Sequence, residues 1–172
     1  MDARQLNRGP VRRPASLDEL DGRIIAALQA NGREPFRGMA ARFGVSEATI
    51  RNRYARLVDS GAMQVTAVTN PLGMGYDAQA LVGITVEGLP EQVADVLATW
   101  PSAIYVVITA GRFDVLVELV ARDRRDLLEL INRVRMLDGV STTETFVYLD
   151  LVKQLFDWGA APVDGAEAER VR

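Results

Sequence analysis

The chain of 172 residues has a net charge of −3, is 48% hydrophobic and contains neither Cys nor His. Its length suits one large domain or two small ones. Without Cys and His, disulfides, thiolate metal sites and the commonest general base are excluded, and an enzyme is disfavoured. No apolar run predicts a transmembrane helix, and the polar residues 1–15 do not resemble a secretory signal. We therefore expect a cytoplasmic protein with no membrane partner, no metal and no cofactor.

Charge is distributed unevenly along the chain. Residues 1–62 contain 11 Arg and 7 acidic residues, a net charge of +4, whereas residues 63–172 contain 9 basic and 16 acidic residues, a net charge of −7. This asymmetry indicates that only the first part contacts a polyanion, and scattered charge is the alternative. Residues 1–15 hold four of the Arg and predict a flexible basic arm, either a DNA-tracking tail or a solvated extension.

Residues 16–62 predict three helices with apolar stripes at helical spacing. A capping box at Ser16–Glu19 begins the first helix, which ends at Asn31–Gly32. The second helix has Pro35 as its first helical residue, and Gly44 follows it as a left-handed cap.

The third helix follows almost at once, with Ser46 as its N-cap and Gly61 as its end. A tight turn at Gly44–Ser46 between two short helices is typical of a helix-turn-helix unit. In such a unit the second helix enters the major groove of DNA. Residues 16–62 are therefore expected to form a DNA-binding domain.

One apolar face of the third helix is predicted to be buried, which leaves the opposite face exposed. On that face Arg51 and Asn52 are expected to read bases, because Arg chelates guanine and Asn chelates adenine. Arg53 and Arg56 are expected mainly to hold phosphates, and Glu47 to favour the helix dipole. An ordinary solvated amphipathic helix is the alternative. The expected DNA-contacting residues are Ser46, Glu47, Ala48, Thr49, Arg51, Asn52, Arg53 and Arg56.

The remainder of the chain predicts an α+β unit. Residues 63–76 indicate a short strand and a linker. Residues 77–156 predict strands and helices in the order β-α-β-β-α-β of a ferredoxin-like fold. Residues 157–172 are rich in Ala, Gly and acidic residues and are expected to be disordered. After a first strand through residues 80–86, the expected elements are a helix at Pro90–Trp100, strands at Ala103–Thr109 and Phe113–Leu119, a helix from the cap Asp123 to Gly139, and a strand at Val140–Asp150.

The hairpin between the two middle strands, Thr109–Asp114, is a candidate binding site. Gly111 permits a tight turn whose amides can hold a carboxylate, and Asp114 can hold an ammonium group, which together suit an amino acid. The alternative is an ordinary hairpin, in which Gly and Asp are common. Ser141–Thr145 either lines a polar pocket or forms an exposed sheet face. The expected effector-binding residues are Thr109, Ala110, Gly111, Arg112, Asp114, Thr143 and Thr145.

Several segments follow one another in the order found in a known family: Leu17–Asp21, Leu28–Arg33, Ala40–Ser46, Asn70–Gly73, Thr109–Asp114, Ala121–Asp123 and Thr143–Thr145. On these residues the span from about Leu17 to Phe156 resembles the Lrp/AsnC family of transcriptional regulators. The resemblance implies a DNA-binding head and a ferredoxin-like ligand domain that dimerises through its sheet. It also implies dimers assembled into tetramers or octamers, with small effectors, usually amino acids, bound between dimers.

Some positions depart from the family pattern. Ala110 stands where the family often has Thr, which questions the usual effector contacts. Pro35 and Gly38 make the second helix atypical, and Asn52 and Tyr54 replace a commoner Arg and Val. We therefore expect this protein to recognise a DNA sequence of its own, different from those of other family members.

Three hypotheses for function follow. The leading one is a nucleoid-associated, sequence-specific transcription regulator that binds double-stranded DNA, itself and a small amino-acid-like effector. The second is an architectural DNA-organising protein without an effector. The third is a small enzyme on a ferredoxin-like scaffold, although no catalytic residue is expected. Apolar residues on both sheet faces, with Leu81, Leu116 and Val120 opposite the helix-facing set, indicate at least a dimer.

Overall fold

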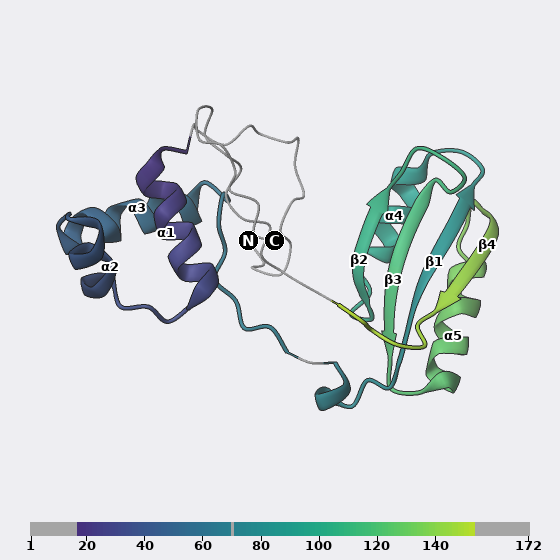
Figure 1. The fold of residues 1–172 in the computed structure, drawn as a ribbon. Helices are drawn as coiled ribbons and strands as arrows, with labels where there is room; N and C mark the ends of the chain where they lie inside the picture. The colour runs from purple at the N-terminus through teal and green to yellow at the C-terminus, as the bar shows by residue number, and fades with distance from the viewer. Residues whose placement is uncertain (1–16, 70, 154–172) are drawn as a thin grey trace. The chain divides into compact units, whose positions relative to one another are not determined.

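The computed structural model describes residues 17–69 and 71–153. These residues form two compact units that divide between Ala67 and Val68, and Figure 1 shows both units. The predicted basic arm, the predicted disordered tail and Ser16 lie outside the described residues.

The first unit contains three helices, α1 (Glu19–Ala30), α2 (Phe36–Phe43) and α3 (Glu47–Asp59). Gly44 has a φ of 70°, in the left-handed region that favours Gly, which confirms the predicted cap of α2 and the tight turn into α3. The apolar faces of the three helices meet in a core whose residues are at most 9% exposed: Ile24, Ile25, Ala27, Leu28, Met39, Ala40, Ile50 and Leu57.

The start of α1 differs from the prediction. Asp18 is the N-cap, and its carboxylate accepts a hydrogen bond from the Asp21 amide while the Asp21 carboxylate accepts one from the Asp18 amide. The predicted box at Ser16–Glu19 is therefore wrong, because this Asp pair forms the reciprocal bonds instead. Pro35 is also the N-cap of α2 and not its first helical residue, since its backbone is extended.

Residues 63–69 form no strand, contrary to the prediction, and the chain continues into a short 3-10 helix, η1 (Leu72–Met74). Polar and apolar residues alternate there as they do in a strand. A strand also needs a neighbouring edge for its backbone hydrogen bonds, and the described sheet contains no partner for this segment.

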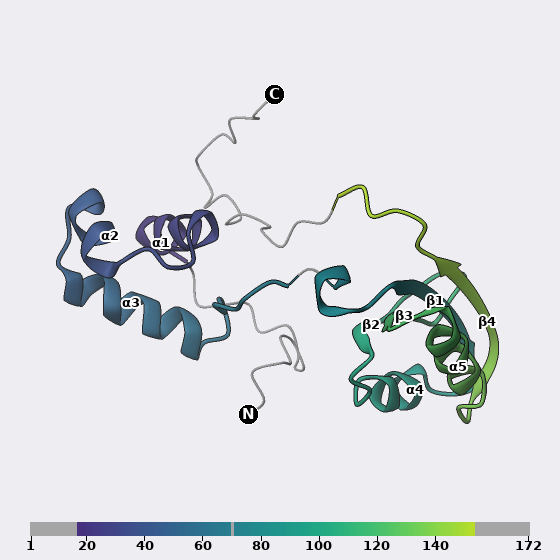
Figure 2. The same ribbon diagram turned by 90° about the horizontal axis from the view of Figure 1, so that it is seen from below.

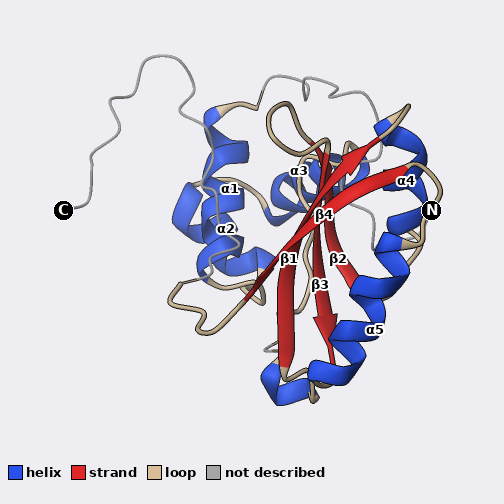
Figure 3. Ribbon diagram, turned by 90° about the vertical axis from the view of Figure 1, so that its right-hand side faces the viewer, coloured by secondary structure: helices blue, strands red, loops and turns tan. Residues whose placement is uncertain are grey.

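The second unit is an antiparallel sheet of four strands in the order β2-β3-β1-β4. Two helices cover one face of this sheet, as Figures 2 and 3 show, and the core lies between the two layers. This arrangement confirms the predicted ferredoxin-like βαββαβ fold. In chain order the elements are β1 (Ala78–Val86), α4 (Pro90–Leu97), β2 (Ala103–Ile108), β3 (Val115–Ala121), α5 (Arg124–Arg135) and β4 (Val140–Val147).

Several elements end earlier than predicted, among them α5, which ends at Arg135 and not at Gly139. α4 ends at Leu97, before the predicted end at Trp100. β4 ends at Val147, before the predicted end at Asp150. Val147 already pairs with Ala80 near the start of β1, so little of the partner strand remains beyond it.

The other face of the sheet, which neither α4 nor α5 covers, carries several apolar side chains. The register places Leu81 of β1 beside Glu118 of β3 and Phe146 of β4 on this face. Tyr105 and Phe146 remain 55% and 45% exposed, respectively. We call this surface the outer face; its residues include Leu81, Tyr105, Val107, Leu116, Glu118 and Phe146.

Candidate functional site

The N-terminus of α3 is closed by side chains. Ser46 Oγ accepts a hydrogen bond from the Thr49 amide at 3.0 Å and lies 2.8 Å from Thr49 Oγ1. Ser46 is therefore the N-cap of α3, as predicted. Glu47 and Arg51 form an ion pair one turn apart, with 2.8 Å between their oxygen and nitrogen atoms. Glu47 thus pairs with Arg51 in addition to lying at the positive end of the helix dipole.

The face of α3 opposite the core is exposed, as predicted, and consists of Ala48, Arg51, Asn52, Ala55 and Arg56. Beside it, the rings of Tyr54 and Phe36 pack with their centroids 5.1 Å apart. The Arg51 guanidinium lies 5.5 Å from the centre of the Phe36 ring. Arg51 and Asn52 therefore stand on a supported helix surface between small Ala side chains, which permit a close approach to base edges.

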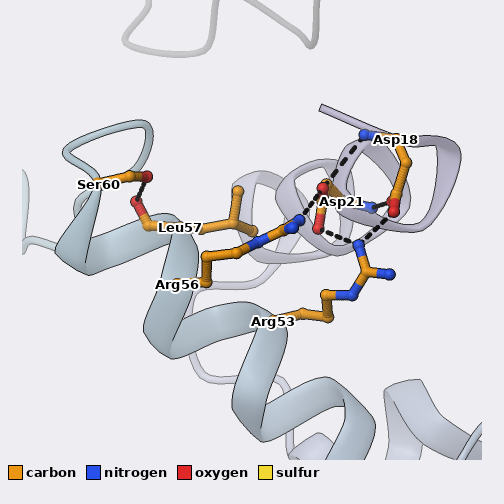
Figure 4. Close-up of polar contacts among 6 residues, drawn as sticks. All are labelled: Asp18, Asp21, Arg53, Arg56, Leu57 and Ser60. Carbon is orange, nitrogen blue, oxygen red and sulfur yellow. Dashed lines mark hydrogen bonds and ion pairs between the residues drawn. The ribbon is translucent and has the colours of Figure 1, made fainter. Parts of the chain in front are cut away.

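The side chains of Arg53, beside the exposed face, and Arg56, at its edge, extend toward α1, where both pair with acidic residues, as Figure 4 shows. The Asp21 side chain is fully buried; its Oδ1 lies 3.2 Å from Arg53 Nη1, and its Oδ2 contacts Arg56 Nη2. Arg53 also contacts the carboxylate of Asp18, which is 48% exposed. We call these four residues the Asp–Arg cluster.

Hydrogen bonds within the Asp–Arg cluster favour its charged forms. The bond from the Asp21 amide and the bond from Arg53 together lower the pKa of Asp18 below its ordinary value. The bonds to Asp18 and Asp21 raise the pKa of Arg53. Asp18 and Arg53 therefore stay ionised at neutral pH.

The phosphate role of Arg53 and Arg56 stays a prediction, because the structure gives both guanidinium groups another partner. Among residues 17–69, the Arg side chains without an ion pair, side-chain hydrogen bond or ring contact are Arg33 and Arg37, and both are exposed. Neither arginine is among the DNA-contacting residues expected from the sequence. The available signal was Arg37 in the first turn of α2, since the first helix of a helix-turn-helix crosses the DNA backbone.

The loop of the β2–β3 hairpin is closed by hydrogen bonds at its base. The Thr109 amide donates to the Asp114 carbonyl at 2.9 Å, and the Thr109 hydroxyl donates to the Phe113 carbonyl at 2.6 Å. At the tip, Ala110 is exposed and Gly111 has a φ of 152°, which side chains disfavour. Gly is therefore needed at the tip, as the sequence indicated.

Asp114 ties the hairpin to β1. Its amide donates to the Ile84 carbonyl at 2.9 Å, and its Oδ2 accepts from the Val86 amide at 2.8 Å. β3 consequently begins at Val115 and not at the predicted Phe113. One oxygen of the carboxylate that we expected to hold an ammonium group is thus bonded to the chain's own backbone.

Arg112 and Phe113 attach the hairpin to the outer face. Arg112 forms an ion pair with Glu144 of β4, with 2.6 Å between nitrogen and oxygen. The Phe113 ring lies where a side chain of residue 83 would be, so that Gly83 leaves room for it. Its centroid is 6.4 Å from that of Phe146, in an edge-on arrangement. Gly83 is therefore the residue that lets the hairpin pack flat on the sheet.

Thr143 and Thr145 lie on the opposite, helix-covered face. The register pairs Thr145 with the core residue Val82. Thr143 Oγ1 accepts a hydrogen bond from Arg135 Nε at 3.2 Å, while the buried Thr145 Oγ1 has no partner among the described residues. The structure therefore does not bring these threonines together with the hairpin side chains on the outer face.

A cavity of about 580 Å³ lies at the other end of the sheet, between residues 74–76, the loop before β2 and α5. In its lining, Arg122 donates two hydrogen bonds to Asp126, at 2.5 and 2.8 Å. Arg133, also in the lining, lies 4.2 Å from the centre of the Trp100 ring. This cavity was not predicted, because segments far apart in the sequence form it.

Within residues 17–69 and 71–153, no helix is both long and apolar enough to cross a bilayer. In the same residues, acidic side chains nowhere gather in the groups of three that hold a metal ion.

Comparison with known proteins identifies both units. The family model of the AsnC-type helix-turn-helix domain matches residues 17–58, and that of the Lrp/AsnC ligand binding domain matches residues 79–157. The HTH-type transcriptional regulator FL11 of Pyrococcus furiosus is 34% identical over 140 residues, which cover 80% of this chain and 93% of that protein.

Solved structures share the fold. E. coli AsnC matches with a TM-score of 0.72 at 25% identity, over 82% of this chain and 97% of its own. A transcriptional regulator of Neisseria meningitidis, solved as a complex with L-Met, matches with a TM-score of 0.73 at 21% identity, over 82% of this chain and 95% of its own. At that identity the likeness concerns the fold alone. From its sequence matches, the chain belongs to the Lrp/AsnC family and is a transcriptional regulator with a DNA-binding helix-turn-helix domain and an Lrp/AsnC ligand-binding domain.

Proposed function

We propose that this regulator reads a specific duplex through the exposed face of α3, and that a small zwitterionic effector changes its assembly through the second unit. The observation that carries the DNA-reading part is the exposed pair Arg51 and Asn52 between Ala48 and Ala55. Arg51 can donate two hydrogen bonds to guanine, and Asn52 can both donate to and accept from adenine.

Phosphate contacts are assigned to Arg33 and Arg37. Both side chains are exposed beside the start of α2 and have no ion-pair partner among the described residues. α2 is the first helix of the helix-turn-helix, the element that crosses the DNA backbone in such proteins. A free guanidinium at that place adds affinity for any sequence.

A duplex selected by the full chain from a random pool tests these roles. Arg51→Ala should lower affinity for that duplex by about 1–3 kcal/mol and relax base choice at one position. Arg37→Ala should weaken binding to selected and unrelated duplexes alike, and should flatten the slope of log Kobs against log salt by about 0.9. Arg124→Ala, which removes an exposed Arg of the second unit, is the matched control. Unchanged affinity of Arg51→Ala for the selected duplex at fixed salt refutes the proposed orientation.

Assembly is assigned to the outer face. An apolar sheet face with Tyr105 and Phe146 about half exposed favours association with a second copy, with dimers joining into tetramers or octamers. Sedimentation at micromolar concentration should give at least a dimer. Phe146→Glu should shift the protein toward smaller species, whereas Leu128→Glu, at an exposed apolar position of α5, should not. A wild-type monomer contradicts the proposal.

The effector is assigned to the hairpin. Gly111 leaves the tip without a side chain, so that backbone amides can meet a ligand carboxylate, and Arg112 adds positive charge beside them. The Asp114 carboxylate can pair with an ammonium group while one of its oxygens binds the Val86 amide. The Neisseria meningitidis regulator was captured with L-Met, which supports an amino acid as the ligand class.

Calorimetry with the twenty amino acids tests this site. Asp114→Asn retains an acceptor for the Val86 amide but removes the charge, so ligand affinity should fall while the unfolding temperature is kept. Asp138→Asn removes an equal charge from an exposed position and is the control. Binding unchanged by Asp114→Asn places the ligand elsewhere, with the cavity beside α5 as the next candidate. No binding by any amino acid favours the architectural, effector-free alternative.

A further inference from the structure

We propose that Asp18 and Asp21 hold two arginines of α3, Arg53 and Arg56, away from DNA phosphates, and thereby lower the affinity of the regulator for unrelated sequences. The inference rests on the proposed entry of α3 into the major groove. It makes the two aspartates determinants of how strongly the regulator binds DNA of any sequence, although neither touches the DNA.

The Asp–Arg cluster holds both arginines through two aspartates of the first turn of helix α1 and its N-cap. Asp21 is fully buried and is shared by both arginines, one at each carboxylate oxygen. Asp18 adds a second partner for Arg53 at the more exposed edge of the cluster. Each aspartate side chain also accepts a hydrogen bond from the backbone amide of the other aspartate. These two bonds hold both carboxylates in place independently of the arginines (Figure 4). The acceptors are therefore preorganised by the capping box of α1.

Releasing an arginine from the Asp–Arg cluster costs free energy. A buried carboxylate that loses a partner keeps an uncompensated charge, which is strongly unfavourable. Moving Arg56 to a phosphate exchanges one anion for another and leaves Asp18 and Asp21 with Arg53 alone, so that the cluster keeps an excess negative charge around the buried Asp21. Because the exchange gains no new kind of interaction, Arg53 and Arg56 should remain on the aspartates when DNA binds.

Pairing within the Asp–Arg cluster weakens the electrostatic attraction of the DNA-binding unit to phosphates. Residues 17–62 contain seven Arg and six acidic residues, so this part of the chain is nearly neutral. Non-specific affinity consists of phosphate contacts, each of which adds about 0.9 to the slope of log Kobs against log salt. Pairing two arginines inside the protein removes such contacts and leaves base reading by Arg51 and Asn52 unchanged. Sequence-independent affinity therefore falls, and base reading contributes a larger share of the binding free energy for the selected duplex.

The test measures the salt dependence of binding by the full chain, with a selected duplex and an unrelated duplex of the same length. Asp18→Asn keeps the N-cap, since Asn caps as well as Asp, but weakens the hold on Arg53. Its slope on the unrelated duplex should steepen by up to about 0.9, equivalent to about eightfold tighter binding at 0.1 M salt. Glu19→Gln removes the same charge from the neighbouring exposed residue, which has no partner in the cluster, and should not change the slope.

A second substitution separates release of the arginine from a general charge effect. Asp18→Asn combined with Arg53→Gln should return the slope to the wild-type value. A steep slope that persists in this double variant overturns the proposal, as does an Asp18→Asn slope equal to that of Glu19→Gln. Flattening by about 0.9 in Arg53→Gln alone also overturns it, because Arg53 would then already contact a phosphate. Circular dichroism of each variant confirms that the helices are kept.

The same measurements distinguish a failure of the proposed DNA reading by α3 from a failure of the inference about Asp18 and Asp21. If the wild-type protein binds neither duplex in a salt-dependent manner, the proposed DNA reading by α3 is wrong, whatever the variants do. If it binds both and the aspartate variants match wild type, only the inference about Asp18 and Asp21 fails.

Discussion

Replacing Gly83 with Ala tests how closely the hairpin packs on the outer face. The added Cβ would lie 2.6–2.7 Å from three carbons of the Phe113 ring. Ordinary carbon contacts are about 3.5–4.0 Å, so the ring or the strand must move by about 1 Å. Such overpacking costs about 1–3 kcal/mol, and the stiffer unfolded chain returns about 0.4–1 kcal/mol. We therefore expect a net destabilisation of the second unit of about 1–2 kcal/mol.

Thermal unfolding of the second unit measures this cost, because 1 kcal/mol lowers the Tm of a domain of this size by about 4–8 °C. The same substitution in a Phe113→Leu background provides the control. Without the ring the cost of Gly83→Ala should shrink to below about 0.5 kcal/mol, which gives a coupling free energy between the two positions. An equal cost in both backgrounds refutes the reasoning, since the methyl group would then meet something other than the ring.

Thr145→Val should leave the second unit equally stable or stabilise it by up to about 1–2 kcal/mol, because it removes a buried hydroxyl that has no hydrogen-bond partner among the described residues. Urea unfolding measures this change, and a loss of stability would show that the hydroxyl is hydrogen-bonded in solution. Burial raises the pKa of Glu118 on the outer face, despite its hydrogen bond with Tyr148. Association through that face would bury Glu118 further, so association should weaken as pH rises through the raised pKa, and Glu118→Gln should abolish this dependence in sedimentation. Deleting residues 1–15, which hold four Arg and one acidic residue, should flatten the salt slope by up to about 3–4 if they follow DNA, whereas an unchanged slope identifies a solvated extension.

Local signals predicted the helices and strands well. Ser46 and Gly44 mark the ends of helices by capping chemistry that depends on a few adjacent residues, and both positions are confirmed. The exposed face of α3 followed from helical periodicity in the same way. Alternation alone was insufficient at residues 63–69, because a strand depends on a partner edge that a local pattern does not contain.

The parts of the site that were missed depend on contacts between distant segments. Asp21 and Arg56 are 35 residues apart, and only the packing of α1 against α3 makes them neighbours. Arg56 therefore looked like a free cation in the sequence. Likewise, a period of two places Thr143 and Thr145 on one face of β4, but the pairing of β4 with β1 decides which face that is. Only the register shows that they point toward the helices.

The position of β1 bears on how a ligand signal could travel. This strand begins beside the linker from the DNA-binding helices and ends beside the hairpin, where Val86 meets Asp114. Its nine residues separate the two places by roughly 26 Å at about 3.3 Å per residue. β1 is hydrogen-bonded on both sides, to β3 and to β4, so it resists sliding or bending. A ligand at the hairpin would thus lie far from the linker of its own chain, which fits the proposed effect of the ligand on assembly. Regulation would then belong to the oligomer, and a chain unable to assemble would bind DNA equally with and without ligand.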